Sequence, residues 1–139
     1  MHTQHILFLS PVNHLSIMAE GWASKLHAPM STFISASYFH ASEDHLPILA
    51  MQEVNIDISH LQAKPLTPEL LKEADLVIAI YDFNRDEQLD IPSFDQKNIL
   101  QWNIPNPSYV QEPIEKWATY QVICDTLAGY VKGLQQYIT

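Results

Sequence analysis

Residues 6–20 (ILFLSPVNHLSIMAE) place the strongest constraint on how this chain folds. Residues 6–9 form an uninterrupted apolar run, which is typical of a strand buried on both faces, because a half-exposed strand would alternate. Residues 10–16 predict a turn, and a helix follows. Open α/β sheets bind ligands at turns that follow the carboxyl ends of parallel strands, where the amides of the next helix favour an anion. Residues 10–16 are therefore the candidate binding site.

The alternation of strand and helix continues along the chain. Apolar runs predict three further strands, at residues 32–37, 75–81 and 98–102. Helical spacing and capping residues predict four helices, at residues 17–26, 46–54, 68–74 and from about 112 to the end. Ser16 is the expected N-cap of the first helix, and Thr67 that of the third. This alternation implies a parallel sheet covered by helices.

The length and composition fit one globular domain over residues 1–139. Hydrophobic residues make up 47% and charged residues 17% of the sequence, which is typical of a chain with a packed core. The net charge of -9 argues against binding to nucleic acid, which needs a positive surface. No apolar stretch is long enough for a membrane span, and no signal sequence precedes the first strand. We therefore expect a soluble, cytoplasmic protein that binds neither nucleic acid nor membranes.

The cysteine and histidines indicate neither a disulfide nor a metal site. Cys124 is the single cysteine and lies in a helical pattern, which favours a small core residue over a reactive thiol. The chain has seven histidines, but His2 and His5 have no Cys or carboxylate partner that would complete a ligand set. We expect no metal and no cofactor.

The glycines also limit what the turn at residues 10–16 can be. All three, Gly21, Gly129 and Gly133, fall in predicted helices, so there is no glycine-rich phosphate loop. A left-handed residue in that turn would have to be Asn13. Asn55, at the end of the second helix, is the expected left-handed C-cap there.

Several short motifs of this chain resemble motifs of one known family. Residues 18–20 read MAE, residues 55–59 read NIDIS and residues 102–107 read WNIPNP. With the strand before residue 10, these motifs resemble the low-molecular-weight protein tyrosine phosphatases and the related thioredoxin-coupled arsenate reductases, in order and over nearly the whole chain. The resemblance implies an α/β fold, a three-layer sandwich with a four-stranded parallel sheet.

The candidate loop departs from the family pattern at its reactive positions. In the family the first strand is followed by a Cys, five residues, an Arg and a Ser or Thr. Here Ser10 falls on the Cys, and Asn13 matches an Asn within the loop. Ser16 falls on the Arg, or else the Arg is deleted, and neither alignment supplies an Arg.

Two later positions depart in the same way. The resemblance places Asn106 where the family has an Asp that protonates the leaving group, and an amide cannot do this. Tyr81 stands where the reductases have a Cys. Residues 82–94 are acidic and polar, and the family layout puts them beside the loop, either covering it or only solvated. Arg85 lies in this segment, and it is the arginine that we would expect to supply a guanidinium to the loop.

These losses weigh heavily against chemistry of the family type. A serine hydroxyl stays protonated without a positioned base, whereas the family mechanism needs a thiolate. The missing Arg removes a bidentate grip on phosphate oxygens. Loss of even one preorganised oxyanion donor costs about 2.7 to 4 kcal/mol in other enzymes. We therefore assign no catalytic residue and describe Ser10, Asn13, His14 and Ser16 as degenerate anion-loop positions, with Asn106 at the degenerate general-acid position.

The leading hypothesis is an inactive member of the family that acts by binding at the loop, either to a protein partner or weakly to a phosphate-like anion. One alternative is a weak phosphate-ester hydrolase that uses Ser10 or Ser16 with His14, although His14 is expected to be exposed or packed at the loop rim. Another is a structural subunit of an oligomer. Ser10 could also be an engineered replacement of a Cys, but restoring the Cys leaves no Arg and no Asp.

Overall fold

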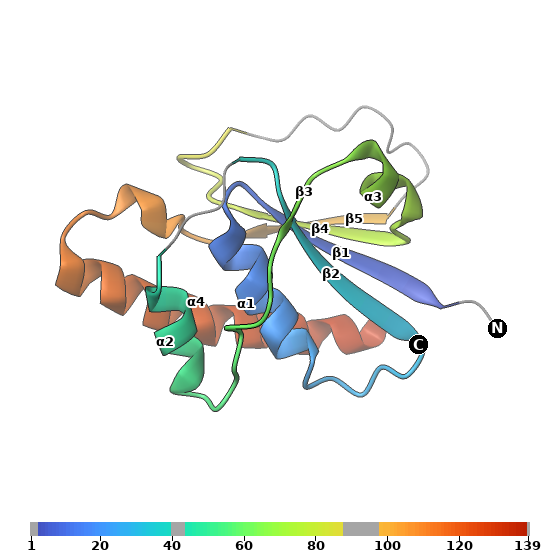
Figure 1. The fold of residues 1–139 in the computed structure, drawn as a ribbon, viewed down its shortest axis with the longest axis horizontal. Helices are drawn as coiled ribbons and strands as arrows, with labels where there is room; N and C mark the ends of the chain where they lie inside the picture. Colours follow the sequence, from blue (N-terminus) through green and yellow to red (C-terminus); the bar gives the residue numbers. More distant parts are fainter. Residues whose placement is uncertain (1–2, 40–43, 88–97, 139) are drawn as a thin grey trace.

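The computed structural model describes residues 3–39, 44–87 and 98–138 and contains one parallel sheet. Its strands are β1 (Gln4–Ser10), β2 (Ser31–Ser37), β3 (Lys64–Pro65), β4 (Leu76–Tyr81) and β5 (Asn98–Asn103). They are arranged in the order β3-β2-β1-β4-β5, so β1 lies at the centre of the sheet (Figure 1). Because all strands run the same way, the segments that follow them meet at one edge.

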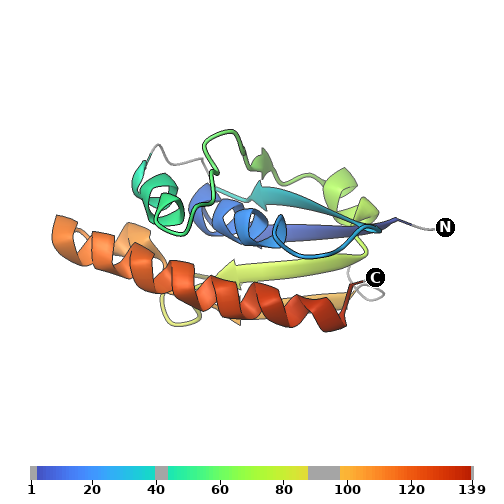
Figure 2. The same ribbon diagram turned by 90° about the horizontal axis from the view of Figure 1, so that it is seen from below.

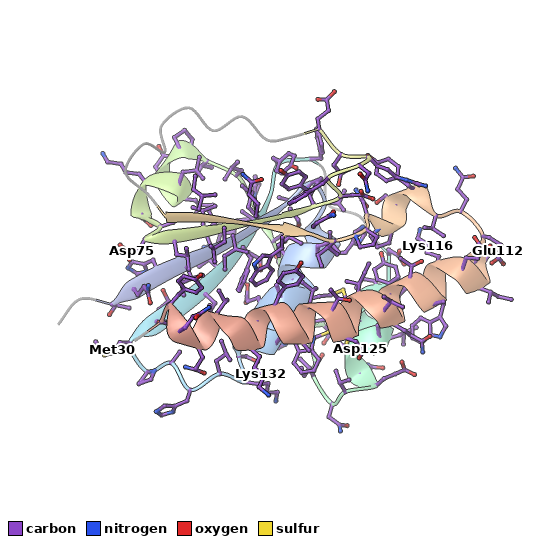
Figure 3. The ribbon with its side chains drawn as sticks, turned by 180° about the vertical axis from the view of Figure 1, so that it is seen from behind. Met30, Asp75, Glu112, Lys116, Asp125 and Lys132 are labelled. Atoms are coloured by element: carbon purple, nitrogen blue, oxygen red, sulfur yellow. The ribbon has the colours of Figure 1, made fainter. Side chains whose placement is uncertain are left out.

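Helices cover both faces of the sheet, which gives three layers (Figure 1). The helices are α1 (Asn13–Ala23), α2 (Leu46–Gln52), α3 (Pro68–Glu73) and α4 (Pro113–Gly133), with 3-10 turns η1 (Pro107–Tyr109) and η2 (Leu134–Gln136). The helices α1, α2 and α4 lie on one face, and α3 lies on the other. Seen from below, α1 and α4 lie side by side along the sheet (Figure 2). The long helix α4 crosses this face from Glu112 towards Lys132 (Figure 3).

The central strand supplies core residues to both faces, which explains its uninterrupted apolar run. Ile6 and Phe8 pack into the larger cluster, together with residues of α1, α2 and α4. Leu7 and Leu9 pack into the smaller cluster, beneath α3. Alternate side chains of a strand point to opposite faces, so a strand covered by helices on both sides has to be apolar throughout.

The parallel α/β sandwich is confirmed, but the sheet has five strands and not four. The additional strand is Lys64–Pro65, which pairs with the end of β2 through Ala36 and Ser37. The Leu66 amide then donates to the Ser37 carbonyl at 3.0 Å. A two-residue strand that contains proline carries no periodic pattern, and proline is tolerated there because this strand lies at the sheet edge.

The capping and left-handed residues predicted from the sequence are confirmed at two positions and wrong at two. The expected N-cap at Thr67 is confirmed, because its hydroxyl accepts from the Leu70 amide at 3.2 Å. Ser16 was the wrong choice for α1, which begins three residues earlier, at Asn13, after an extended Val12 without a side-chain cap. The left-handed assignment of Asn13 was also wrong. Within the described ranges, Asn55 is the one non-glycine residue with positive φ, at 62°, as predicted for a C-cap.

Gly21 is the position where α1 comes closest to the chain after α2. A Cβ on Gly21 would lie 2.6 Å from Cγ2 of Ile58 and 3.2 Å from Cγ2 of Ile56. Both atoms belong to β-branched side chains, which have little freedom to move aside. The missing side chain therefore permits this packing.

We expect Gly21→Ala to destabilise the protein by about 1 to 3 kcal/mol, because overpacking outweighs the gain in helix propensity. Gly129→Ala is the matched control, since its Cβ would meet nothing within 4 Å. That control should stabilise the protein by about 0.5 to 1 kcal/mol. Urea denaturation of both variants measures the difference, and equal effects of the two substitutions would contradict the packing argument.

Candidate functional site

The candidate site lies where β1, β4 and β5 end. Residues 11–12 follow β1, residues 82–87 follow β4, and residues 104–109 follow β5 (Figure 1). Of the polar segment expected beside the loop, residues 88–94 lie outside the described residues. Residues 82–87 do lie beside the end of β5: the Phe83 amide donates to Oδ1 of Asn103, the last residue of that strand, at 3.0 Å.

Ser10, at the nucleophile position, is fully buried and hydrogen-bonded on both sides. Its hydroxyl donates to the Val12 carbonyl and accepts from the Ser16 amide, with 3.2 Å between Ser16 N and Ser10 Oγ. The Ser10 side chain therefore joins the end of the strand to the first turn of α1. Neither of these two contacts is with His14.

The connection between β1 and α1 is only Pro11 and Val12. Proline has no amide hydrogen to offer an anion. The carbonyls of Ser10 and Pro11 accept from the amides of Tyr38 and Phe39, at 3.3 and 2.9 Å. An anion-binding loop needs a row of amides that converge on one point, and two residues are too few to surround a ligand.

Ser16 is also fully buried, one turn inside α1. Its carbonyl oxygen lies 2.9 Å from the Ser35 hydroxyl, which also lies 2.7 Å from Oε1 of Glu20. Burial raises the pKa of Glu20 because it disfavours the charged carboxylate, although the Ser35 hydrogen bond acts in the opposite direction. These contacts link α1 to β2 beneath the loop.

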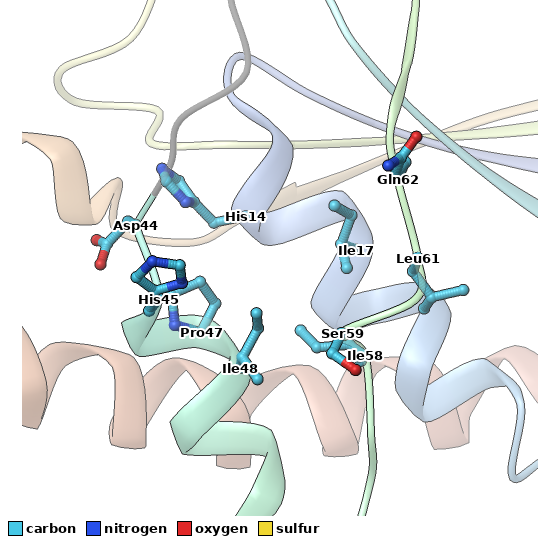
Figure 4. A pocket seen from close by; sticks show the side chains of 10 residues that line it. All are labelled: His14, Ile17, Asp44, His45, Pro47, Ile48, Ile58, Ser59, Leu61 and Gln62. Carbon is cyan, nitrogen blue, oxygen red and sulfur yellow. The ribbon is translucent and has the colours of Figure 1, made fainter.

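His14 is buried, with 3% of its surface exposed, so the first of the two expected positions, an exposed side chain, is wrong, and the ring is packed. Its ring lies edge-on to Tyr120, with 5.9 Å between ring centroids. Burial lowers the His14 pKa from 6.5 to about 4, while the nearby Asp44 carboxylate partly opposes the shift. The His14 ring is neutral at pH 7 and lines a pocket with Asp44 and Ile17 (Figure 4).

Asn106, at the general-acid position, is buried, and both the oxygen and the nitrogen of its side-chain amide form hydrogen bonds. Its Oδ1 accepts from the Ser108 amide at 2.9 Å, and its Nδ2 donates to Oδ1 of Asp86 at 3.0 Å. Asp86 also accepts from the Tyr109 hydroxyl at 2.7 Å and from the Asp82 amide at 2.9 Å. A carboxylate at position 106 could not donate to Asp86, so the amide suits this arrangement.

Arg85, the single arginine of the chain, lies on the surface against Tyr109. Its Cζ atom is 5.8 Å from the centroid of the Tyr109 ring, a distance typical of a cation–π contact. The Tyr81 hydroxyl donates to Oε1 of Gln101 at 2.8 Å. Arg85 thus contacts the segment after β5, and Tyr81 contacts β5 itself; neither of these two contacts is with the β1–α1 loop.

Asp86 is the site residue that sequence reasoning missed, although it belongs to the acidic segment that was noticed. Three donors converge on its carboxylate, from Asp82, Asn106 and Tyr109. Nothing in the local sequence distinguishes Asp86 from its acidic neighbours. Three exposed aromatic residues at this edge were also missed: Phe39 and Phe83, each two residues after a strand end, and Tyr109, the last residue of η1.

The described residues gather no three His, Cys, Asp or Glu side chains into a possible metal site. Cys124 is buried as predicted, and burial raises its pKa. Within residues 3–39, 44–87 and 98–138, no helix combines the length and apolar character that a membrane span requires.

The fold is that of arsenate reductases and low-molecular-weight tyrosine phosphatases. The chain is 30% identical to an arsenate reductase of Bacillus licheniformis and 29% identical to one of Bacillus subtilis. Each alignment covers 95% of this chain and 95% of the other protein. Its structure is similar to that of a low-molecular-weight protein tyrosine phosphatase from T. tengcongensis, with 27% identity, a TM-score of 0.77, and coverage of 97% and 99% of the two chains.

An arsenate reductase in the phosphate-binding state is similar as well, with a TM-score of 0.78, 21% identity, and coverage of 98% of this chain and 99% of that one. No family model matches the chain. On the identity and coverage of its relatives, the chain belongs to the family of arsenate reductases and low-molecular-weight tyrosine phosphatases.

The burial of neutral His14 predicts a loss of stability in acid. The unfolded chain binds a proton on this ring near pH 6.5, whereas the folded protein does so only near pH 4, so stability falls as the pH is lowered between these values. Between pH 7.5 and 5 the loss should be about 2 kcal/mol. Urea denaturation of the protein and of His14→Gln at both pH values measures it.

The His14→Gln variant should lose that part of the pH dependence, because glutamine does not titrate. His27→Gln, at an exposed position, is the control and should keep the wild-type dependence. Comparison with the wild type removes the contribution of Glu20, whose raised pKa acts in the opposite direction. An unchanged pH dependence in His14→Gln would contradict the assignment.

Proposed function

We propose that this protein is a non-catalytic member of its family and acts by binding a protein partner at the carboxyl edge of the sheet. The observation that carries this proposal is the pairing of the Ser10 hydroxyl with the Val12 carbonyl and the Ser16 amide. A nucleophile must direct its proton to a base, and here the proton is committed to a backbone carbonyl.

The other positions support the same proposal. Asn106 donates to Asp86, so the general-acid position serves to hold the segments after β4 and β5 together. Arg85 rests on Tyr109. The low pKa of His14 makes it a weak base, and its ring faces the pocket beside α2. These contacts give no support to a hydrolase built from Ser10 or Ser16 with His14.

The choice of a protein partner over an anion rests on two features of the edge. The two-residue connection offers few free amides, so any binding of a phosphate-like anion is weak. The same edge exposes three aromatic side chains, Phe39 at 62%, Phe83 at 45% and Tyr109 at 45%. Aromatic residues and arginine are enriched in the energetically important parts of protein interfaces. Arg85 lies among them.

We expect no turnover of an aryl phosphate, and no thioredoxin-coupled reduction of arsenate, above the level of Ser10→Ala. Steady-state assays of both proteins test this, with thermal unfolding to show that the variant is folded. Turnover that is robust in the wild type and lost in Ser10→Ala would overturn the proposal. A rise in melting temperature with phosphate or arsenate, but not with chloride at equal ionic strength, would instead identify an anion binder.

Partner binding should depend on the exposed aromatic residues. A protein partner is first recovered by cross-linking to this chain. Phe83→Ser should then lower the affinity for that partner at least about tenfold, since aromatic residues in interfaces often contribute more than 1 kcal/mol. Leu49→Ser on α2 is the control, because Leu49 is equally exposed, at 45%. Equal loss in both variants, or no loss in Phe83→Ser, would place binding elsewhere. Light scattering shows whether the partner is a second copy, as the oligomer alternative requires.

A further inference from the structure

A second concave site lies on the helical face, beside α2. The pocket has a volume of about 440 Å³ and is bounded by α1, the start of α2 and residues 58–62 (Figure 4). This volume is in the range of pockets that hold small organic ligands, about 300 to 1,000 Å³. The pocket shares His14 with the candidate loop, but none of its lining residues belongs to the segments after β4 or β5, which carry Phe83 and Tyr109.

The walls of this pocket are apolar and branched. Ile17 comes from α1, Ile48 from α2, and Ile58 from the segment that packs against Gly21. Ile17 and Ile58 are themselves buried at 8% and 2% exposure, so the helix and loop that carry them are fixed by the core. A ligand with an apolar body would gain burial against these side chains.

The polar groups of the pocket gather at one end. His14, Asp44 and His45 lie together there, while Leu61 and Gln62 lie at the other end (Figure 4). Neither ring nitrogen of the nearly buried His14 has a hydrogen-bond partner among the residues that the structure describes. A ring nitrogen of His14 is therefore left for a ligand that enters the pocket.

The charge at this end excludes one class of ligand. Asp44 is the formally charged residue of the lining, and no lysine or arginine is among the described residues that line the pocket. Its carboxylate accepts from the Tyr120 hydroxyl at 2.8 Å and from the Leu46 amide at 3.0 Å, and Lys116 Nζ lies 3.5 Å from it. An anion would meet this carboxylate and the net charge of -9 of the whole chain.

We propose that this pocket binds a small organic amine with an apolar body. The protonated amine donates hydrogen bonds to the His14 ring and to the Asp44 carboxylate, and the apolar body lies against Ile17, Ile48 and Ile58. The neutral imidazole offers one acceptor nitrogen for this purpose, and the Tyr120 ring holds it in place. Binding at this pocket is independent of the partner surface proposed above.

Three probes of nearly equal shape test the proposal on the full chain: benzylamine, benzyl alcohol and benzoate. We expect benzylamine to bind most tightly and benzoate least, because Asp44 lines the polar end, whereas Lys116, which contacts the same carboxylate, is not among the lining residues. Titrations followed by methyl NMR should shift the signals of Ile17, Ile48 and Ile58. Absence of these shifts at high millimolar benzylamine, or equal affinity for benzoate, would overturn the proposal.

Two variants separate this site from non-specific binding. His14→Phe keeps a ring against Tyr120 but removes the acceptor nitrogen, and should weaken benzylamine about tenfold. Ile48→Trp fills the pocket from its wall and should abolish the shifts, and it keeps the test valid if His14→Phe does not fold. His27→Gln is the exposed control. Unchanged affinity in the two pocket variants would contradict the assignment.

Discussion

The Ser10 hydroxyl connects the end of the central strand to the segment that follows it and to the first helix. It lies at the end of the central strand, donates to the Val12 carbonyl in the connection and accepts from the Ser16 amide in the helix. The carbonyls of Ser10 and Pro11 are in turn paired with the chain after β2. Three carbonyls of this turn and the Ser16 amide are therefore already paired, and an anion that approached the Ser16 amide would have to displace the Ser10 hydroxyl.

The departures from the family pattern form a consistent set. A thiol is a weak donor and acceptor, so the two bonds of Ser10 suit a hydroxyl better than the Cys of the relatives. Asn106 likewise uses both ends of its amide, one on the Ser108 backbone and one on Asp86. Each substituted side chain makes contacts that its family counterpart would make poorly. These contacts are the reason for proposing that the site has a structural role rather than a catalytic one.

Sequence reasoning succeeded where the controlling signal is local. The uninterrupted runs at β1 and β4, the Thr67 cap and the left-handed Asn55 each follow from a few neighbouring residues. The family resemblance then supplied the layered fold. The start of α1 was misplaced because Val12 contributes no side-chain cap, and β3 was missed because two residues carry no period.

The candidate site was less predictable because its contacts join distant parts of the chain. Asn106 and Asp86 are 20 residues apart, and His14 is buried against Tyr120, which lies on the last long helix. The sequence around each of these residues contains no local pattern that predicts the contact. Sequence could identify which reactive groups had been replaced, but it could not show what the replacements bind.

The position of Cys124 has a consequence for how the protein withstands chemical stress. Its thiol is 3% exposed and lies between α4 and α2, with Sγ 3.6 Å from Sδ of Met51. Peroxides, alkylating agents and trivalent arsenic all attack the thiolate, and burial keeps this sulfur protonated and out of reach. The single cysteine of the chain is therefore shielded from these reagents as long as the protein stays folded.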